Sequence, residues 1–493
     1  MQSKRDQVQA HMFVMGRLNS GMLSAEPDAP ESPLARTSRG MVFGIVIALL
    51  LCAGAFVYGL LSPGGNNTWR SGTALVVNKD TGARYLYLDG RLRPVRNYAS
   101  ARLLLGEDLT VASVGTRSLA DTPVGTPVGI EGAPDSVPGR DRLEQRAWRV
   151  CSTAPAQAED GGGPNAARFG TVLTVGGDRG ADRPLNAGEA ALLKGPDDTL
   201  HLMWRGSRLR LDEDHGAVAS LGYGSATPRP VTAAFLDSLP AGPDLTPPAV
   251  PHRGDAGPAL GGQDTRVGQL FKVQVPGGDP VWHVLADDGL RPLTETAAAL
   301  LLGDPRTRTD AYDGEAPRPR TLTSDVLGSH LAAGGIGSSA ALPEAPPRLT
   351  DLAADALCSV TEPGDSDGTK VSGALVPTAA LAPLAQHTEQ STTPACYAVQ
   401  GIVVPPRHGA LVRVLGAAGR TLGDTTYLVT ESGVKYRVTD ETALKALGYG
   451  AQDAVQLPSP LLAMLPTGPD LSQAAATGSA QVRTTTAACG GRT

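Results

Sequence analysis

Aromatic residues and catalytic motifs are both scarce in this sequence. Phe, Trp and Tyr together make up 4% of the 493 residues, so a folded core has to rely on Leu, Val and Ala. No GxxxxGK[ST] phosphate loop, GxSxG nucleophile elbow or HExxH zinc motif occurs. The nearest string to a phosphate loop, Gly364 to Lys370, has the wrong spacing and no apparent strand before it. We therefore expect no catalytic residue, no metal site and no cofactor.

The charge of the chain is also modest. The formal net charge is −6, whereas a nucleic-acid-binding protein usually carries an excess of basic residues. Hydrophobic residues at 41% and charged residues at 19% are enough to build a core. The 60 Gly and 40 Pro exceed the average share of about 12% for the pair and predict many turns and ordered loops.

One long uncharged run stands out against this background. Met41 to Leu61 contains 21 residues without a charge, and a helix of that length rises about 30 Å, the thickness of a bilayer core. A buried core helix would show a polar face. A signal peptide would begin nearer the N-terminus and end in a small-residue cleavage site. We therefore expect a retained transmembrane helix.

The charges beside this run indicate its orientation. Arg36 and Arg39 precede it closely, whereas Arg70 and Lys79 are the nearest basic residues after it. The positive-inside rule thus favours a cytoplasmic N-terminus.

Cysteine usage supports the same orientation. Of the five cysteines, Cys52 lies within the apolar run and the other four follow it. Their even number and wide spacing predict two disulfides in an oxidising compartment, although four unrelated buried thiols are an alternative. Four cysteines allow three pairings, and spacing alone leaves the pairing open. These four are Cys151, Cys358, Cys396 and Cys489.

The segment before the membrane run contains a candidate amphipathic helix. Residues 5–18 place Val8, Met12, Met15 and Leu18 on one face at helical spacing. A helix of about 14 residues is marginal alone in water. We expect it to need a partner or a membrane surface.

The remainder of the chain contains an internal repeat. Residues 73–106 and 271–303 both show two alternating strands, an Asp-Gly turn, Leu-Arg-Pro and a short Ala/Leu helix that ends at Gly. Residues 190–222 and 411–448 fit the same pattern with drift. From the turn Gly to the terminal Gly the spacing is 16, 16, 14 and 15 residues (Gly90–Gly106, Gly206–Gly222, Gly289–Gly303 and Gly433–Gly448).

Local chemistry predicts how each repeat turns and ends. The turn glycines join strands, and the terminal glycines suit a left-handed helix C-cap. The Asp-Gly turns also carry arginines, which could form a ligand-binding loop, but a hairpin turn with local ion pairing explains the same residues. The expected helix N-caps are Asn97, Asp212, Thr294 and either Thr439 or Asp440.

These units are too small to stand alone, so we expect them to pack on a shared core. The fold class is mixed α+β: a single N-terminal transmembrane helix is followed by a β-rich ectodomain with a central core and four small strand-strand-helix repeats. The expected layout is a tail at 1–40, the transmembrane helix at 41–61, repeat 1 at 62–110, the first core part at 111–184, repeat 2 at 185–248, repeat 3 at 262–309, the second core part at 310–408, repeat 4 at 409–472 and a C-terminal tail at 473–493.

This organisation resembles EccB, the single-span core component of the type VII secretion system of actinobacteria. The strings that carry the resemblance are residues 72–75 (GTAL), 88–95 (LDGRLRPV), 100–103 (SARL) and 128–134 (VGIEGAP), together with the contexts of Cys151 and Cys358. The resemblance spans nearly the whole chain. It implies a structural scaffold subunit of the secretion complex on the cell membrane, with its ectodomain on the extracytoplasmic side.

The resemblance also implies the pairing of the cysteines and the partners. Cys151–Cys358 is the disulfide shared by the family, and Cys396–Cys489 looks like an additional pair. The implied partners are an EccC-type FtsK/SpoIIIE ATPase, EccD and EccE, with self-association through the ectodomain. We expect five residues of the tail to bind partners, namely Arg5, Asp6, Gln7, Phe13 and Arg17.

Two other functions compete with the scaffold reading. Members of the family have been described as ATPases, but the lack of a phosphate-binding loop gives an extracytoplasmic ATPase no support in this sequence. A cell-wall glycan-binding module would use tandem repeats, but the low aromatic content argues against it.

Overall fold

The structure is a computed structural model. It describes residues 3–24, 33–61, 67–153, 170–177, 180, 182–274, 278, 280–337, 339–352, 355–364, 368–381, 392–415, 421–486 and 489. Within it the chain forms two compact units. The first unit comprises residues 1–92 and 110–125, and the second comprises residues 93–109 and 126–493.

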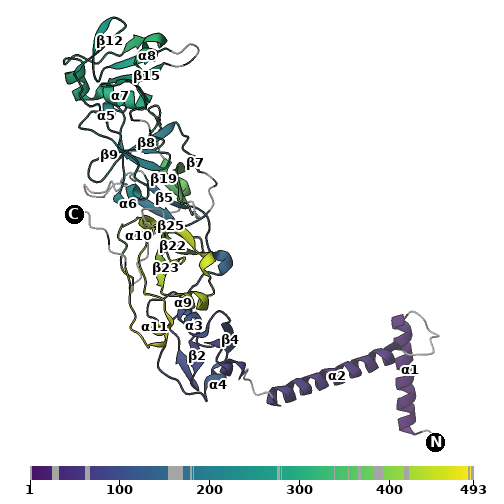
Figure 1. Ribbon diagram of the computed structural model, residues 1–493. Coiled ribbons are helices and arrows are strands. Elements are labelled where there is room, and N and C mark those ends of the chain that lie inside the picture. The colour runs from purple at the N-terminus through teal and green to yellow at the C-terminus, as the bar shows by residue number, and fades with distance from the viewer. Residues whose placement is uncertain are drawn as a thin grey trace, which may run out of the picture. The chain divides into compact units, whose positions relative to one another are not determined.

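The first unit begins with two helices, α1 (Lys4–Ser24) and α2 (Pro33–Leu61) (Figure 1). The segment of α2 from Ser38 to Tyr58 has a mean hydropathy of 2.6, and its side chains are exposed. Its 21 residues rise about 30 Å, which matches a bilayer core. The helix begins eight residues before the predicted span. Proline is tolerated at this start, because the N–H groups of a first turn have no hydrogen-bond partner within the helix.

A small β-sheet completes the first unit. Its strands lie in the order β3-β2-β1-β4, with β1 antiparallel to β2 and parallel to β4. Trp69 is fully buried beside Val76 and Leu92, and its ring meets the Tyr87 ring edge-on at 5.4 Å. The strands are β1 (Ala74–Asn78), β2 (Arg84–Leu88), β3 (Arg91–Pro94) and β4 (Thr110–Val114).

Three further sheets, all in the second unit, have this same strand order in the residues that the structure describes. In each, two successive antiparallel hairpins are completed by a fourth strand parallel to the first. One of them, the sheet around β8, also gains β18 (Arg348–Leu349). The strands are β8 (Glu189–Lys194), β9 (Leu200–Trp204), β10 (Ser207–Arg210) and β11 (Arg229–Pro230); β14 (Leu270–Val273), β15 (Val281–Ala286), β16 (Gly289–Leu293) and β17 (Arg320–Leu322); and β22 (Ala410–Leu415), β23 (Thr421–Val429), β24 (Lys435–Val438) and β25 (Val455–Pro458).

A short helix follows the third strand of each of these four sheets, and most of its predicted caps are confirmed. The side chains of Asn97, Thr294 and Asp440 accept hydrogen bonds from the backbone N–H three residues later. The cap predicted at Asp212 is wrong, because the helix begins only at Ala217 and the Asp212 carboxylate accepts from the backbone N–H of His215 instead. The helices are α3 (Tyr98–Leu105), α5 (Ala217–Ser220), α7 (Glu295–Gly303) and α9 (Glu441–Ala446).

Three of the four glycines at the helix ends have the positive φ that the prediction requires. Gly106, Gly222 and Gly448 have φ of 88°, 82° and 86°, but the ψ of −171° at Gly106 lies outside the left-handed helical region. Gly303 is instead the last residue of α7, whose C-cap is Asp304 with an extended backbone. The residue bounds of the repeats themselves remain a prediction.

A six-stranded sheet occupies the centre of the second unit, in the order β21-β6-β5-β19-β20-β7. It combines strands from residues 148–184 with strands from residues 355–403, which are far apart in the sequence. Trp148 and Leu357 on this sheet share one core with Leu193, Phe235 and residues of the last repeat sheet. The strands are β5 (Trp148–Thr153), β6 (Gly170–Thr174), β7 (Arg183–Pro184), β19 (Asp355–Glu362), β20 (Lys370–Pro377) and β21 (Gly401–Val403).

Several helices of the second unit pack against one another. Helix α3 packs against α9 and against α11 (Gln473–Thr477), while α5 packs against α7. The second contact is close, because a Cβ on Gly303 would overlap the side chain of Ser220. The C-terminal tail predicted at 473–493 begins with helix α11, whose N-cap Ser472 accepts a hydrogen bond from the backbone N–H of Ala475.

The remaining elements are short. They are the hairpin β12 (Ala256–Leu260) and β13 (Gln263–Arg266), the helices α4 (Thr116–Leu119), α6 (Ala233–Asp237), α8 (Ser324–His330) and α10 (Ser459–Ala463), and the single helical turns η1 (Asn67–Ser71), η2 (Arg140–Arg142), η3 (Thr307–Ala311), η4 (Thr378–Ala380) and η5 (Ala451–Asp453).

Candidate functional site

Helix α1 carries all five residues predicted to bind partners. At about 100° per residue, Asp6, Phe13 and Arg17 fall on one side of the helix. The apolar stripe, from Val8 through Met12, Met15 and Leu18 to Met22, falls on the other side. The stripe residues are 49–82% exposed, and Phe13 is 69% exposed. The helix predicted at 5–18 thus extends over Lys4–Ser24, and both the apolar stripe and the side that carries Phe13 are exposed.

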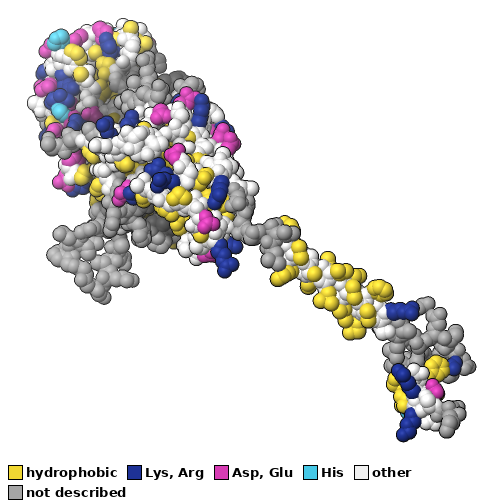
Figure 2. Space-filling view, turned by 90° about the horizontal axis from the view of Figure 1, so that it is seen from below, with side chains coloured by type: hydrophobic (Ala, Val, Ile, Leu, Met, Phe, Trp, Pro, Cys, Tyr) yellow, Lys and Arg dark blue, Asp and Glu magenta, His cyan; other side chains and the backbone are white. Residues whose placement is uncertain are grey.

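Helix α2 presents an apolar surface with basic charge at its N-terminal end. Figure 2 shows hydrophobic side chains along its length and Lys/Arg atoms at its end near α1. Arg39 lies one residue inside the apolar segment that begins at Ser38, and Cys52 is exposed on the same helix. Lipid hydrocarbon chains can cover such a surface, because the backbone N–H and C=O groups of a helix are hydrogen-bonded within it.

The four cysteines that follow α2 are joined in two pairs. Cys151 on β5 lies directly opposite Cys358 on β19, with Cα atoms 4.0 Å apart and both residues fully buried. Cys396 is joined to Cys489, with Cα atoms 5.3 Å apart. The first pair therefore crosslinks the two chain segments that form the central sheet.

The string Gly364 to Lys370 is a hairpin connection. Strand β19 ends at Glu362 and β20 begins at Lys370, so a strand does precede the string, contrary to the sequence-based expectation. A phosphate loop joins a strand to the N-terminus of a helix, whose backbone N–H groups hold the phosphates. A strand-to-strand hairpin lacks that helix; residues 365–367 lie outside the described part.

The Asp-Gly turns act as turns in the described residues. Asp288 forms a bidentate pair with Arg291, at 2.6 and 3.0 Å, within the same hairpin. This bond and the pairing charge of Arg291 lower the pKa of the Asp288 carboxyl. Among described residues, no group of three or more metal-ligating side chains comes together.

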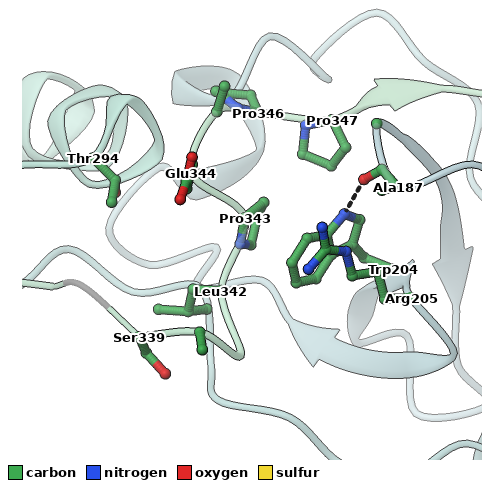
Figure 3. Close-up of a pocket in the computed structure, with 13 residues that line it drawn as sticks. Ala187, Trp204, Arg205, Thr294, Ser339, Leu342, Pro343, Glu344, Pro346 and Pro347 are labelled. Carbon is green, nitrogen blue, oxygen red and sulfur yellow. Dashed lines mark hydrogen bonds between the residues drawn. The ribbon is translucent and has the colours of Figure 1, made fainter.

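A pocket of about 770 Å³ lies beside Trp204 in the second unit (Figure 3). The Trp204 indole N–H donates to the Ala187 carbonyl at 2.7 Å, and the Arg205 guanidinium lies 4.6 Å from the ring centroid. Pro343 and Pro347 face this ring from the segment that leads to β18. Trp204 is only 6% exposed, so it does not offer the open aromatic platform on which sugars stack.

Two further side chains matter for packing and were not singled out from the sequence. Arg102 donates to the Leu447 carbonyl and links α3 to the end of α9, while Lys435 is buried with its ammonium on two backbone carbonyls. Arg102 does lie in the string 100–103 that carries the family resemblance. Nothing in the local sequence marks Lys435 as buried.

Comparison with known proteins adds the family. The model of the family described as "Type VII secretion system ESX-1, transport TM domain B" matches residues 1–482. The ESX-2 secretion system ATPase EccB2 of Mycobacterium tuberculosis is 29% identical, over 96% of this chain and 94% of its own length. The ESX-3 secretion system ATPase EccB3 of Mycolicibacterium smegmatis is 28% identical, over 95% of this chain and 89% of its own.

Solved structures show the same fold. The EccB3 dimer from the ESX-3 core complex matches with a TM-score of 0.64 at 25% identity, covering 82% of this chain and 99% of that one. A chain of the intact ESX-5 inner membrane complex matches with a TM-score of 0.63 at 24% identity, over 97% of this chain and 95% of that one. The β-rich remainder that follows a single N-terminal apolar helix is therefore the fold of these proteins. On the family match over residues 1–482, this chain belongs to the EccB family of type VII secretion systems.

Proposed function

We propose that the protein is a structural scaffold subunit of a type VII, ESX-type secretion complex in the cell membrane. The observation that carries this is the match over the whole chain: the family model covers residues 1–482, membrane helix and repeat sheets included. Related chains occur in an ESX-5 inner membrane complex and in its periplasmic assembly.

The orientation has the N-terminus in the cytoplasm and the β-rich domain outside it. Arg36 and Arg39 lie at the N-terminal end of the apolar segment of α2, as the positive-inside rule favours for a cytoplasmic end. The pairs Cys151–Cys358 and Cys396–Cys489 follow the helix, and disulfides persist in oxidising compartments. Charge and cysteine chemistry thus support the same orientation.

Partner binding divides between the two sides of the membrane. Helix α1, with Arg5, Asp6, Gln7, Phe13 and Arg17, contacts partners on the cytoplasmic side of the membrane. These partners are an EccC-type FtsK/SpoIIIE ATPase and the membrane proteins EccD and EccE. An exposed helix of this kind gains most of its stability from packing against another surface. The ectodomain mediates self-association, which the dimer described for the related EccB3 supports.

Co-purification from membranes tests this division. Deletion of residues 1–34, or the pair Phe13→Ala and Arg17→Ala, should leave the protein inserted but reduce recovery of the EccC-, EccD- and EccE-type partners by about tenfold, or about 1.4 kcal/mol of binding. Arg117→Ala, at an exposed arginine of α4, is the matched control and should retain them. Undiminished recovery with the deleted chain would contradict the role of α1.

The protein itself is not an enzyme in this proposal, although its curated relatives carry ATPase in their names. The hairpin connection between β19 and β20 supports this, since no helix N-terminus follows it to hold a phosphate. Purified full-length protein should show no ATP turnover. Turnover that co-migrates with the protein and is abolished by Lys370→Ala would establish the opposite.

A further inference from the structure

Lys435 places a positive charge inside the last repeat sheet. It is the first residue of β24 and is 7% exposed. Its Nζ donates to the Leu462 carbonyl at 2.5 Å and to the Leu465 carbonyl at 3.0 Å, at and just beyond the end of α10. An ammonium has three N–H donors, so one donor remains after these two bonds.

Among the residues that the structure describes, this buried charge has no counter-ion, because no carboxylate lies within the 4.0 Å ion-pair distance of Nζ. Asp470, in the segment that pairs with β24, is itself engaged by the Thr485 hydroxyl and by Arg437. Burial alone lowers the pKa of Lys435 to about 8, with no contribution from a neighbouring charge. Buried cations in proteins are usually paired with an anion, because removing an isolated charge from water is costly.

Lys435 is one of the residues that line a cavity of about 340 Å³. Its wall is partly apolar, with Val414 and Leu462, and partly hydroxylic, with Ser459, Thr467 and Thr486. The disulfide between Cys396 and Cys489 closes one side. The volume falls at the lower end of the range for small-molecule sites, in which apolar walls surround a few placed polar groups.

We propose that this cavity binds a small carboxylic acid, whose carboxylate pairs with the Lys435 ammonium while its short hydrocarbon part lies against the apolar wall. Hydroxyl groups at the rim can donate to the second carboxylate oxygen. The carboxylate of the ligand is then the counter-ion of the Lys435 ammonium. This binding site is separate from the scaffold role and does not depend on it.

Calorimetric titration of the detergent-solubilised full-length protein with butyrate tests the proposal. Butyrate should bind saturably, whereas butyramide, which has the same shape without the charge, should bind at least about tenfold more weakly. Lys435→Met keeps the length of the side chain and should abolish butyrate binding. Lys445→Met is the control, because Lys445 is exposed and paired with Glu441 at 2.8 Å, and it should leave binding unchanged.

The wild-type protein provides a second test that does not depend on the folding of a variant. The cation is lost as pH rises through the pKa of Lys435, so butyrate should bind at least about tenfold more weakly at pH 9.5 than at pH 7. Equal binding of butyrate and butyramide, butyrate affinity that is unchanged at pH 9.5, or no butyrate binding at pH 7, would overturn the proposal.

Discussion

Two histidines in strands of the ectodomain make its stability sensitive to acid. His283 on β15 is 3% exposed, and its Nδ1 has no hydrogen-bond partner among the described residues. Burial lowers the pKa of His283 below its usual value of 6.5. His201 on β9 behaves similarly, since burial and then the charge of Arg208 lower its pKa. Protonating the His283 ring places an uncompensated charge inside a sheet. Asp197 and Asp244 partly offset the charge of a protonated His201.

The sign of the pH dependence follows from these shifts. Below pH 6.5 the unfolded chain binds a proton at His283 that the folded chain does not bind, so acid favours unfolding. The midpoint of urea unfolding of the wild type should therefore fall between pH 7 and pH 5. His283→Leu removes one of these protons, and its midpoint should fall less over the same interval.

His252 supplies a control of opposite sign. It is exposed, and its hydrogen bond to Asp287 at 2.6 Å raises its pKa. Its contribution is present below pH 6.5 and is lost as pH rises through the folded-state pKa, so His252→Gln should not reduce the acid sensitivity. An identical pH slope in His283→Leu and in the wild type would refute the role of His283.

The ends of the short helices show how one element is fixed against another. Gly448 follows α9 and Gly222 follows α5, and both have φ near +85°. They differ in their surroundings. A Cβ on Gly448 would overlap the Arg102 guanidinium, which donates to the Leu447 carbonyl at 3.0 Å, whereas a Cβ on Gly222 would meet nothing within 4 Å. Gly448 thus keeps α3 bound to α9.

Alanine at these two glycines separates backbone strain from lost packing. Gly222→Ala should destabilise by about 1–2 kcal/mol, the cost of a left-handed backbone alone. Gly448→Ala should cost about 1 kcal/mol more, because it displaces the Arg102 hydrogen bond. The measurement is the free energy of urea unfolding. In the Arg102→Ala background the extra cost should vanish, and an additive double variant would show that the contact does not carry it.

Local chemistry also explains which elements could be predicted from sequence. The caps at Asn97, Thr294 and Asp440 were predictable, because a cap depends on residues within one turn. Asp212 has the same residue type, but the chain makes another turn before α5 begins at Ala217. The burial of Lys435 was not predictable, since it depends on α10, which follows β24 by more than twenty residues and folds over it.

At the scale of the whole molecule, the central sheet depends on pairing that no local pattern encodes. Strand β5 pairs with β19 across 207 residues, measured between Cys151 and Cys358. The sequence predicted that residues 111–184 and 310–408 supply a core, but strand order is non-local and could not be derived from it. Contacts of such long range must offset the entropy of closing a large loop.

The two disulfides should contribute unequally to the stability of the whole molecule, although both close long loops. The chain-entropy model gives each about 5 kcal/mol, for separations of 207 and 93 residues. Cys151 and Cys358 are fully buried on adjacent central strands, so the pair Cys151→Ala and Cys358→Ala should lower the unfolding temperature of the entire ectodomain. The pair Cys396→Ser and Cys489→Ser should mainly loosen the C-terminal tail, because Cys489 follows the exposed segment 479–486. Thermal unfolding and limited proteolysis separate the two effects.

Peptide mapping without reductant tests the pairing on which this prediction depends. A Cys151–Cys396 or Cys151–Cys489 peptide as the main species would be incompatible with a crosslink between β5 and β19.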